Sequence, residues 1–144
     1  MPQSNDAELT DAFTSETGEV VADNEPNSGP PGGPAAATFD LHLQLVAGNV
    51  IGNSAANYTV RADCIDETLA APNASMSLAP DNQQFNAANG WVASGTNFVK
   101  EQVNTITVDP AAGGHVLRYV ASLVSVNGDI ASFYESPLFI LITP

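Results

Sequence analysis

Two alternating apolar and polar runs close the chain and meet at Asn127-Gly128. They read HVLRYVASLVSV over residues 115–126 and DIASFYESPLFILIT over residues 129–143. An Asn-Gly pair between two such runs predicts a β-hairpin, because both central residues of a type I′ turn need a positive φ and these two residue types tolerate it. We therefore take this hairpin as the element around which the fold is organised.

The hairpin register assigns each side chain to a face, because residues directly opposite in an antiparallel pair share one. With Asn127-Gly128 as the turn, Ala121 lies opposite Tyr134. The face expected in the core carries Leu117, Tyr119, Ala121, Leu123, Ile130, Tyr134 and Leu138. The other face is too apolar for a solvated surface and carries Val116, Arg118, Val120, Ser122, Val124, Ala131, Phe133 and Glu135. Pro137 cannot donate a ladder bond, so it predicts a bulge or a change of partner strand.

The middle of the chain holds further strand patterns. In TFDLHLQLVA, residues 38–47, the expected inward side chains are Phe39, Leu41, Leu43 and Leu45, and the expected outward ones are Asp40, His42 and Gln44. Similar or shorter patterns occupy residues 57–65, 74–80 and 97–108, one more begins at Trp91, and residues 81–90 are expected to be a loop. About seven strands without a convincing helix predict an all-β fold, a single antiparallel β-sandwich.

The final hairpin resembles the last two strands of immunoglobulin-like and fibronectin-type-III domains. Tyr119 in an alternating strand, the VNG turn and the proline-interrupted ESPLFILI carry the resemblance, over about 30 of the 144 residues. The chain lacks the usual Trp of an early strand and the Cys…Trp…Cys core of true immunoglobulin domains. The resemblance implies an Ig-like sandwich of the kind used in virion accessory proteins, and it implies no activity, because such folds host many roles.

The first 37 residues differ from the rest. They are polar and acidic and include SGPPGGP, which suits neither helix nor sheet. We expect residues 1–37 to form an extended arm and residues 38–144 to form the sandwich domain. The arm would be disordered in isolation, so we expect a neighbouring subunit to hold it; the alternative is that it folds back on its own domain, with GEVVA as an edge strand.

The charge balance excludes one class of partner and suggests an environment. Sixteen acidic side chains against three basic ones give a formal net charge of −13, which argues against nucleic-acid binding. So few Lys and Arg would suit salty surroundings, so a halophilic or marine source is a compositional expectation. We expect no membrane association, because the longest apolar runs, about five to seven residues, fall short of the roughly 20 that span a bilayer. No signal peptide is visible, which favours assembly in a cytoplasm.

Few residues suggest chemistry. Cys64 is the only cysteine, so it forms no intramolecular disulfide, and we expect a small buried side chain. His42 and His115 lie far apart in sequence and are expected to be structural, since the sequence alone assembles no catalytic triad around either. Weak Ca²⁺ candidates follow the strand at 57–65, with a solvated acidic loop as the favoured alternative: Asp63, Asp66 and Glu67. Trp91 is a candidate sugar-stacking residue, although a core position is favoured.

These observations favour a non-enzymatic structural subunit without a cofactor, most concretely a decoration or cement (minor capsid) protein of a virion. We expect it to bind a major capsid protein or identical subunits. The expected interface residues are Phe13, Val20, Val21, Val116, Val120, Val124, Phe133, Phe139 and Leu141. The alternatives are a tail, spike or surface-filament subunit, and a carbohydrate-binding or adhesive module using Trp91. The expected location is the virion, assembled in a host cytoplasm, or alternatively a cell surface.

Overall fold

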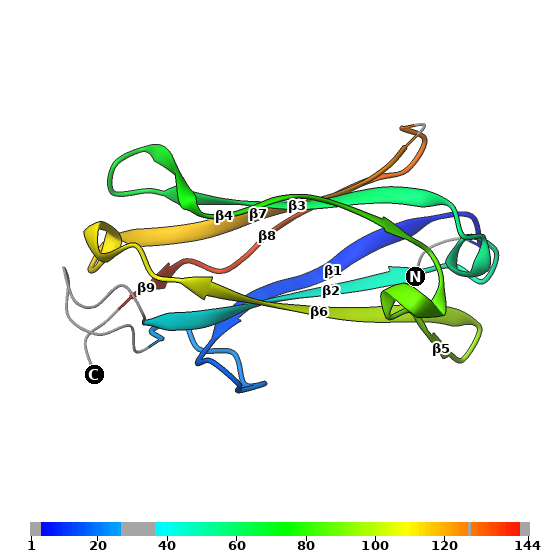
Figure 1. Cartoon of the computed structure of the whole chain (residues 1–144), viewed down its shortest axis with the longest axis horizontal. Coiled ribbons are helices and arrows are strands. Elements are labelled where there is room, and N and C mark those ends of the chain that lie inside the picture. The colour runs from blue at the N-terminus through cyan, green and yellow to red at the C-terminus, as the bar shows by residue number, and fades with distance from the viewer. Residues whose placement is uncertain (1–3, 27–36, 127, 142–144) are drawn as a thin grey trace.

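The chain folds into two antiparallel β-sheets that face each other, as Figure 1 shows. The computed structural model describes residues 4–26, 37–126 and 128–141. The strand order is β1-β2-β6-β5 in the first sheet and β4-β3-β7-β8 in the second, where β9 also pairs with β7. The predicted antiparallel sandwich is therefore confirmed, with nine strands in the described part of the chain instead of about seven.

Each sheet draws its strands from separate parts of the sequence. The first sheet consists of β1 (Ala7–Ser15), β2 (Thr38–Ala47), β5 (Val92–Ser94) and β6 (Asn97–Thr107). The second consists of β3 (Asn57–Asp66), β4 (Ala71–Gln84), β7 (Val116–Ser125), β8 (Ala131–Glu135) and β9 (Phe139–Ile140). Short 3-10 turns occupy Ile51–Asn53, Ala87–Asn89 and Pro110–Ala112. No helix within the described residues is long and apolar enough to span a membrane.

The strand bounds follow the sequence patterns closely. β2 covers the expected 38–47, β3 extends the expected 57–65 by one residue, and β6 ends one residue before the expected 108. β4 is much longer than predicted, because pairing with β3 continues to Gln84 through residues expected to be a loop. Polar side chains in that stretch conceal the strand, since one face of this edge strand is solvated.

β2 supplies the centre of the core. The four predicted inward side chains are all buried: Phe39, Leu41, Leu43 and Leu45. The prediction of a solvated opposite face is wrong for Asp40 and His42, because both are also buried. Side chains from β1 and the loop after it cover that face of the sheet, as the contacts of these two residues show below.

The C-terminal hairpin has the predicted register as far as Pro137. Ala121 lies opposite Tyr134, Leu123 lies opposite Ser132, and Gly128 adopts the positive φ of 76° that the turn requires. Asn127 lies outside the described residues. The inward residues Leu117, Tyr119, Ala121, Leu123 and Ile130 are buried, as the alternation predicted.

Beyond Pro137 the register shifts by one residue. Leu117 lies opposite Phe139 instead of Leu138. Ser136 takes up the extra position, since its N–H donates to the Tyr119 carbonyl (2.9 Å) and its Oγ accepts from the Tyr119 N–H (2.8 Å). A one-residue slip exchanges the two faces of a strand. Leu138, predicted to lie in the core, is therefore 55% exposed, and Phe139 is 1% exposed.

Part of the predicted arm belongs to the sandwich. Residues 7–15 form β1, which pairs with β2 and also reaches the second sheet, where the Leu9 N–H donates to Ser132 Oγ (2.9 Å). Asp23 then returns to donate its N–H to the Thr14 carbonyl (2.8 Å). The domain boundary at residue 37 is therefore wrong for these residues. Residues 7–15 instead fold back on their own domain, which was the alternative prediction, although GEVVA forms no strand. Residues 27–36 of the predicted arm lie outside the described residues.

The register shift at Pro137 predicts unequal effects for two adjacent residues. Phe139→Ala should lower the free energy of unfolding by about 3–5 kcal/mol, because it leaves a cavity in the core. Leu138→Ala, the matched control, should change it by only about 0.5 kcal/mol, as surface substitutions do. Urea unfolding followed by tryptophan fluorescence measures both, and equal losses would contradict the register.

Candidate assembly surface and polar clusters

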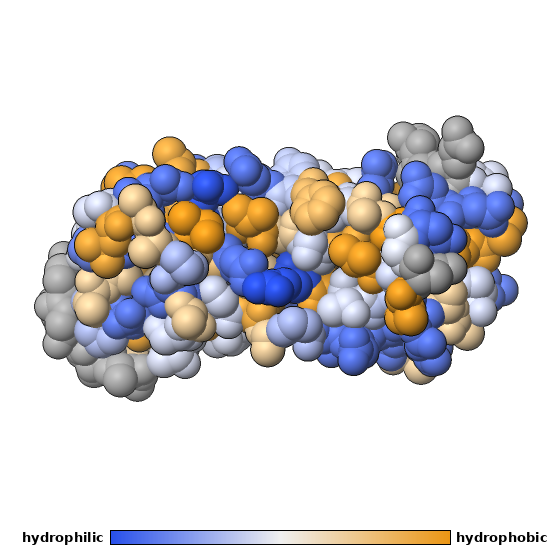
Figure 2. Space-filling view, turned by 90° about the horizontal axis from the view of Figure 1, so that it is seen from above, coloured by the Kyte–Doolittle hydropathy of each residue, from blue (hydrophilic) through white to orange (hydrophobic). Residues whose placement is uncertain are grey.

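The outer face of the second sheet carries the predicted interface residues of β7 and β8. Ser122 in β7 lies between Arg61 of β3 and Phe133 of β8, so these three side chains form one row across the face. Phe133 is 69% exposed, and Val120 and Val124 are half-buried. Figure 2 shows this face, where apolar side chains lie in several groups separated by polar ones. No strand of the described residues covers it.

Ion pairs run between these apolar groups. Arg118 contacts Glu67 through Nε and Glu135 through Nη1 (3.2 Å), and Arg61 Nε lies 3.1 Å from Asp63 Oδ2. Exposed pairs of this kind contribute about 0–1 kcal/mol each to stability. They place opposite charges side by side between the apolar groups of this face.

The three weak Ca²⁺ candidates do not converge. Asp63 pairs with Arg61, Glu67 with Arg118, and Asp66 with His115. Across the residues that the structure describes, no group of three or more His, Cys, Asp or Glu side chains could hold a metal ion. The favoured alternative, a solvated acidic loop, is correct for Glu67, which is exposed. It is wrong for Asp66, which is buried.

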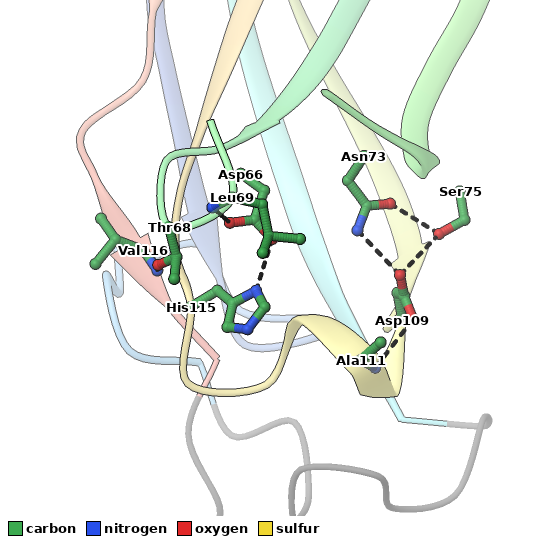
Figure 3. Close-up of polar contacts among 9 residues, drawn as sticks. All are labelled: Asp66, Thr68, Leu69, Asn73, Ser75, Asp109, Ala111, His115 and Val116. Atoms are coloured by element: carbon green, nitrogen blue, oxygen red, sulfur yellow. Dashed lines mark hydrogen bonds and ion pairs between the residues drawn. The ribbon is translucent and has the colours of Figure 1, made fainter. Parts of the chain in front are cut away.

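Asp66 anchors the end of the second sheet, as Figure 3 shows. Its Oδ2 lies 2.7 Å from His115 Nδ1, and its Oδ1 accepts the Leu69 N–H at 3.0 Å. Burial alone would raise the pKa of the Asp66 carboxyl, but hydrogen bonds from His115 and from the Leu69 and Thr68 backbones outweigh it and hold the pKa below its ordinary value. The cluster ties the β3–β4 turn to the start of β7.

A second polar cluster lies beside it. Asp109 Oδ2 accepts a hydrogen bond from Asn73 Nδ2 (3.0 Å), and Asp109 Oδ1 accepts the Ala111 N–H (3.0 Å). Ser75 Oγ donates to Asn73 Oδ1 (2.8 Å) within β4, and the Asn73–Asp109 bond joins β4 to the β6–β7 connection (Figure 3). A hollow of about 330 Å³ separates this cluster from Asp66. Both carboxylates are occupied by donors of the same chain, so the arrangement acts as a structural clasp.

The first sheet assembles a third cluster around His42, which no sequence pattern predicted. His42 Nε2 lies 2.8 Å from Ser15 Oγ, and His42 Nδ1 lies 3.1 Å from Glu101 Oε1. The Phe13 ring stacks on the imidazole at 4.6 Å between centroids and 7° between planes. β1 contributes Phe13 and Ser15, β2 contributes His42 and β6 contributes Glu101. The register brings them together, because His42 lies opposite Phe13 on one side and opposite Val103 on the other.

This order of groups is that of a catalytic triad, with a hydroxyl, an imidazole and a carboxylate in sequence. The surroundings of the hydroxyl oppose acyl transfer. Ser15 is fully buried, and its Oγ lies 2.9 Å and 3.1 Å from the carbonyl oxygens of Glu16 and Glu19. An oxyanion needs N–H donors, whereas carbonyl oxygens repel it. We therefore interpret the cluster as a clasp that fixes the N-terminal strand; Asp40 adds to it by accepting the Gly18 N–H at 2.9 Å.

Trp91 and Cys64 both lie in the hydrophobic core. Trp91 is buried, and its indole N–H donates to the Tyr58 hydroxyl at 2.8 Å. A buried indole has no face free for a sugar, so the core position is confirmed and the sugar-stacking role is wrong. Cys64 is also buried as predicted, and burial followed by the charge of Asp66 raises the pKa of its thiol to about 12.

The predicted interface residues separate into two groups. Phe13, Phe139 and Leu141 are buried within the domain, so their assignment to an interface is wrong. A buried side chain reaches a neighbour only if its own packing is undone. Exposed or half-buried members remain, and these are Val20, Val21, Val116, Val120, Val124 and Phe133.

The lowered pKa of Asp66 predicts an acid-sensitive clasp. Its stabilisation is present above the unfolded carboxyl pKa of about 3.9 and is lost as the pH falls through the lower folded value, because the unfolded state then binds the proton more readily. Asp66→Asn should therefore destabilise the protein at neutral pH, and its difference from wild type should shrink below about pH 4. Urea unfolding across pH measures this. Asp81→Asn, at an exposed position, should keep the wild-type pH dependence.

The enclosure of Ser15 predicts an unreactive hydroxyl. Incubation of the native protein with diisopropyl fluorophosphate should leave its intact mass unchanged, with a known serine hydrolase as the positive control. A single adduct that maps to Ser15 and is absent in His42→Gln would contradict the structural role of the clasp.

No family model matches the chain, and no curated protein matches it. The resemblance of the final hairpin to immunoglobulin-like domains therefore stays a prediction.

Proposed function

We propose that the protein is a non-enzymatic structural subunit of a large assembly, most concretely one that decorates or cements a viral capsid. The observation that carries this proposal is the uncovered outer face of the second sheet, with Phe133 at 69% exposure beside Val120 and Val124. Exposed apolar groups on a sheet face mark contact surfaces, because leaving them in water is unfavourable and invites association.

The polar side chains on this face suit such a contact. Arg118 and Arg61 are held in ion pairs with Glu135 and Asp63, which leaves no free cation on this part of the described face. Interfaces commonly combine apolar contacts with polar groups that stay hydrated at the rim. A partner that supplies an apolar counterface could bury Phe133 without stripping water from unpaired charges.

A second exposed apolar group follows β1. Val20 and Val21 are both exposed, and the loop that carries them is held to the domain by the bonds of Asp23 and by Asn24, whose carbonyl accepts the Ile140 N–H (2.9 Å). This loop offers a preformed contact, so little ordering entropy opposes its binding. A subunit with two such contacts can bridge two neighbours.

The charge of the chain sets the conditions for assembly. At −13, identical subunits repel one another at low ionic strength, and salt reduces this repulsion because the Debye length falls from about 10 Å at 0.1 M to about 3 Å at 1 M. The proposed partners are therefore identical subunits in a salty medium or a major capsid protein. The proposed location is the virion, with assembly in a host cytoplasm.

A tail, spike or surface-filament subunit, with a cell-surface location, is the second candidate. The same uncovered face favours it, since filaments repeat one heterologous contact between copies. The carbohydrate-binding alternative has lost its main residue with the burial of Trp91.

The proposal predicts salt-promoted association through Phe133. Wild-type protein should form species larger than a dimer at high concentration and molar salt. Phe133→Asp should weaken their formation at least about ten-fold, as the loss of an interface anchor does. Val126→Asp is the matched control, because Val126 is equally exposed but lies at the hairpin turn. Analytical ultracentrifugation measures the species, and identical behaviour of both variants and wild type would contradict the proposal.

A further inference from the structure

One edge of the first sheet lacks a partner strand. β6 pairs with β2 without a register break, from Thr107 opposite Thr38 to Phe98 opposite Ala47. On its other side, β5 pairs only with residues 97–99 (Figure 1). Within the described residues, the backbone of residues 100–107 therefore has no strand on that edge. Such an edge presents N–H and C=O groups ready to pair with another strand.

The other long edges carry features that discourage pairing. β1 has a register break between Leu9 and Asp11. β4 contains Pro72 and Pro80, and Pro137 separates β8 from β9. Prolines and bulges are common devices that block edge-to-edge association. β6 has neither, which distinguishes this edge from the others in the described part of the fold.

The single cation of β6 does not close the edge. Lys100 is half-buried on the side facing the second sheet, where its amine donates to Gln83. Burial, the larger effect, lowers the pKa of Lys100, and the charge of Asp81 partly offsets it. Past Lys100 the edge reads EQVNTIT, with one charged side chain in seven residues. A copy of the same strand would therefore meet little charge repulsion there, although the chain as a whole is strongly acidic.

We propose that β6 pairs with β6 of a second copy, antiparallel and about a two-fold axis at Val103. Residues directly opposite must share a face, so residues 101, 103 and 105, on the outer face, can only oppose one another. With Val103 opposite itself, Glu101 lies opposite Thr105 and Gln102 opposite Asn104. Val103 is 48% exposed in the single chain and is covered in the pair, where two β-branched side chains form a favourable cross-strand contact.

This register also keeps like charges apart. A shift that placed Glu101 opposite its own copy would set two carboxylates against each other, which is unfavourable. The isologous arrangement joins two four-stranded sheets into one continuous sheet and closes on itself as a dimer. The dimer goes beyond the proposed function, because it uses the first sheet's edge, whereas the proposed assembly contact uses the second sheet's outer face.

Cysteine cross-linking of the full chain tests the register. Val103→Cys should form a disulfide-linked dimer on mild oxidation, because paired residues lie within the Cα distance of about 4.4–6.8 Å that a disulfide needs. Thr107→Cys is the matched control on the same face of the same strand. In the proposed register the residues at position 107 of the two copies are offset by eight residues, about 27 Å. Thr107→Cys should therefore cross-link no more than wild type, whose Cys64 is buried.

Sedimentation of two lysine variants tests the association itself. Val103→Lys places two cations opposite each other and should raise the dimer dissociation constant at least about ten-fold, whereas Thr107→Lys should leave it unchanged. Circular dichroism must show both variants folded. Equal cross-linking of the two cysteine variants, or a wild-type dimer that Val103→Lys leaves intact, would overturn the proposal, as would a wild-type monomer throughout.

The outcomes also separate this proposal from the proposed function. Phe133→Asp should remove the larger species and leave the dimer, whereas Val103→Lys should remove the dimer contact and leave the Phe133 contact able to form. If Phe133→Asp by itself abolished all association, including the dimer, the β6 contact would be overturned. If wild type formed the dimer but no larger species, only the proposed function would be overturned.

Discussion

The pairing of β2 with β1 on one side and β6 on the other is the constraint on which the first sheet depends. It fixes Phe13, His42 and Val103 in one row across three strands. The inner face of β2 fills the core, and its outer face carries the His42 clasp. Because the side-chain period of a strand is two, a slip of one residue would exchange these faces and expose four large apolar side chains. The hydrophobic cost of that exchange pins the register, and the register in turn assembles the clasp.

Polar burial in this protein is tolerated because each buried group has partners. Asp40, His42 and Asp66 are all buried, and each accepts or donates hydrogen bonds within the chain. Their bonds connect segments far apart in sequence, so the same contacts that offset desolvation also fix the tertiary arrangement. Three Lys and Arg side chains cannot pair with all sixteen acidic ones, so charge repulsion on the surface opposes compaction and association until salt screens it.

Local alternation predicted the fold class and the faces of β2 and β7 because each has one strongly apolar face. It failed where a distant segment decides the outcome. Asp40 and His42 have the pattern of a solvated face, but β1 and the loop after it cover both. Ser15, which contacts His42, lies 27 residues away from it in sequence. Leu138 and Phe139 exchange faces because Ser136 bonds to Tyr119, a contact that no local pattern encodes. Glu101 lies 59 residues from His42, so only the β2–β6 register brings them together.

The placement of β1 has a consequence for the order of synthesis. β1 leaves the ribosome before the residues that hold it in place, because the His42 clasp needs Glu101 of β6 and the Leu9 N–H needs Ser132, just after the hairpin turn. β1 cannot dock fully until residue 132 has emerged. Contacts of such sequence separation slow folding, because the intervening chain must be ordered first. β1 is therefore exposed to water while residues 16–132 are synthesised, and its acidic side chains favour its hydration during that time.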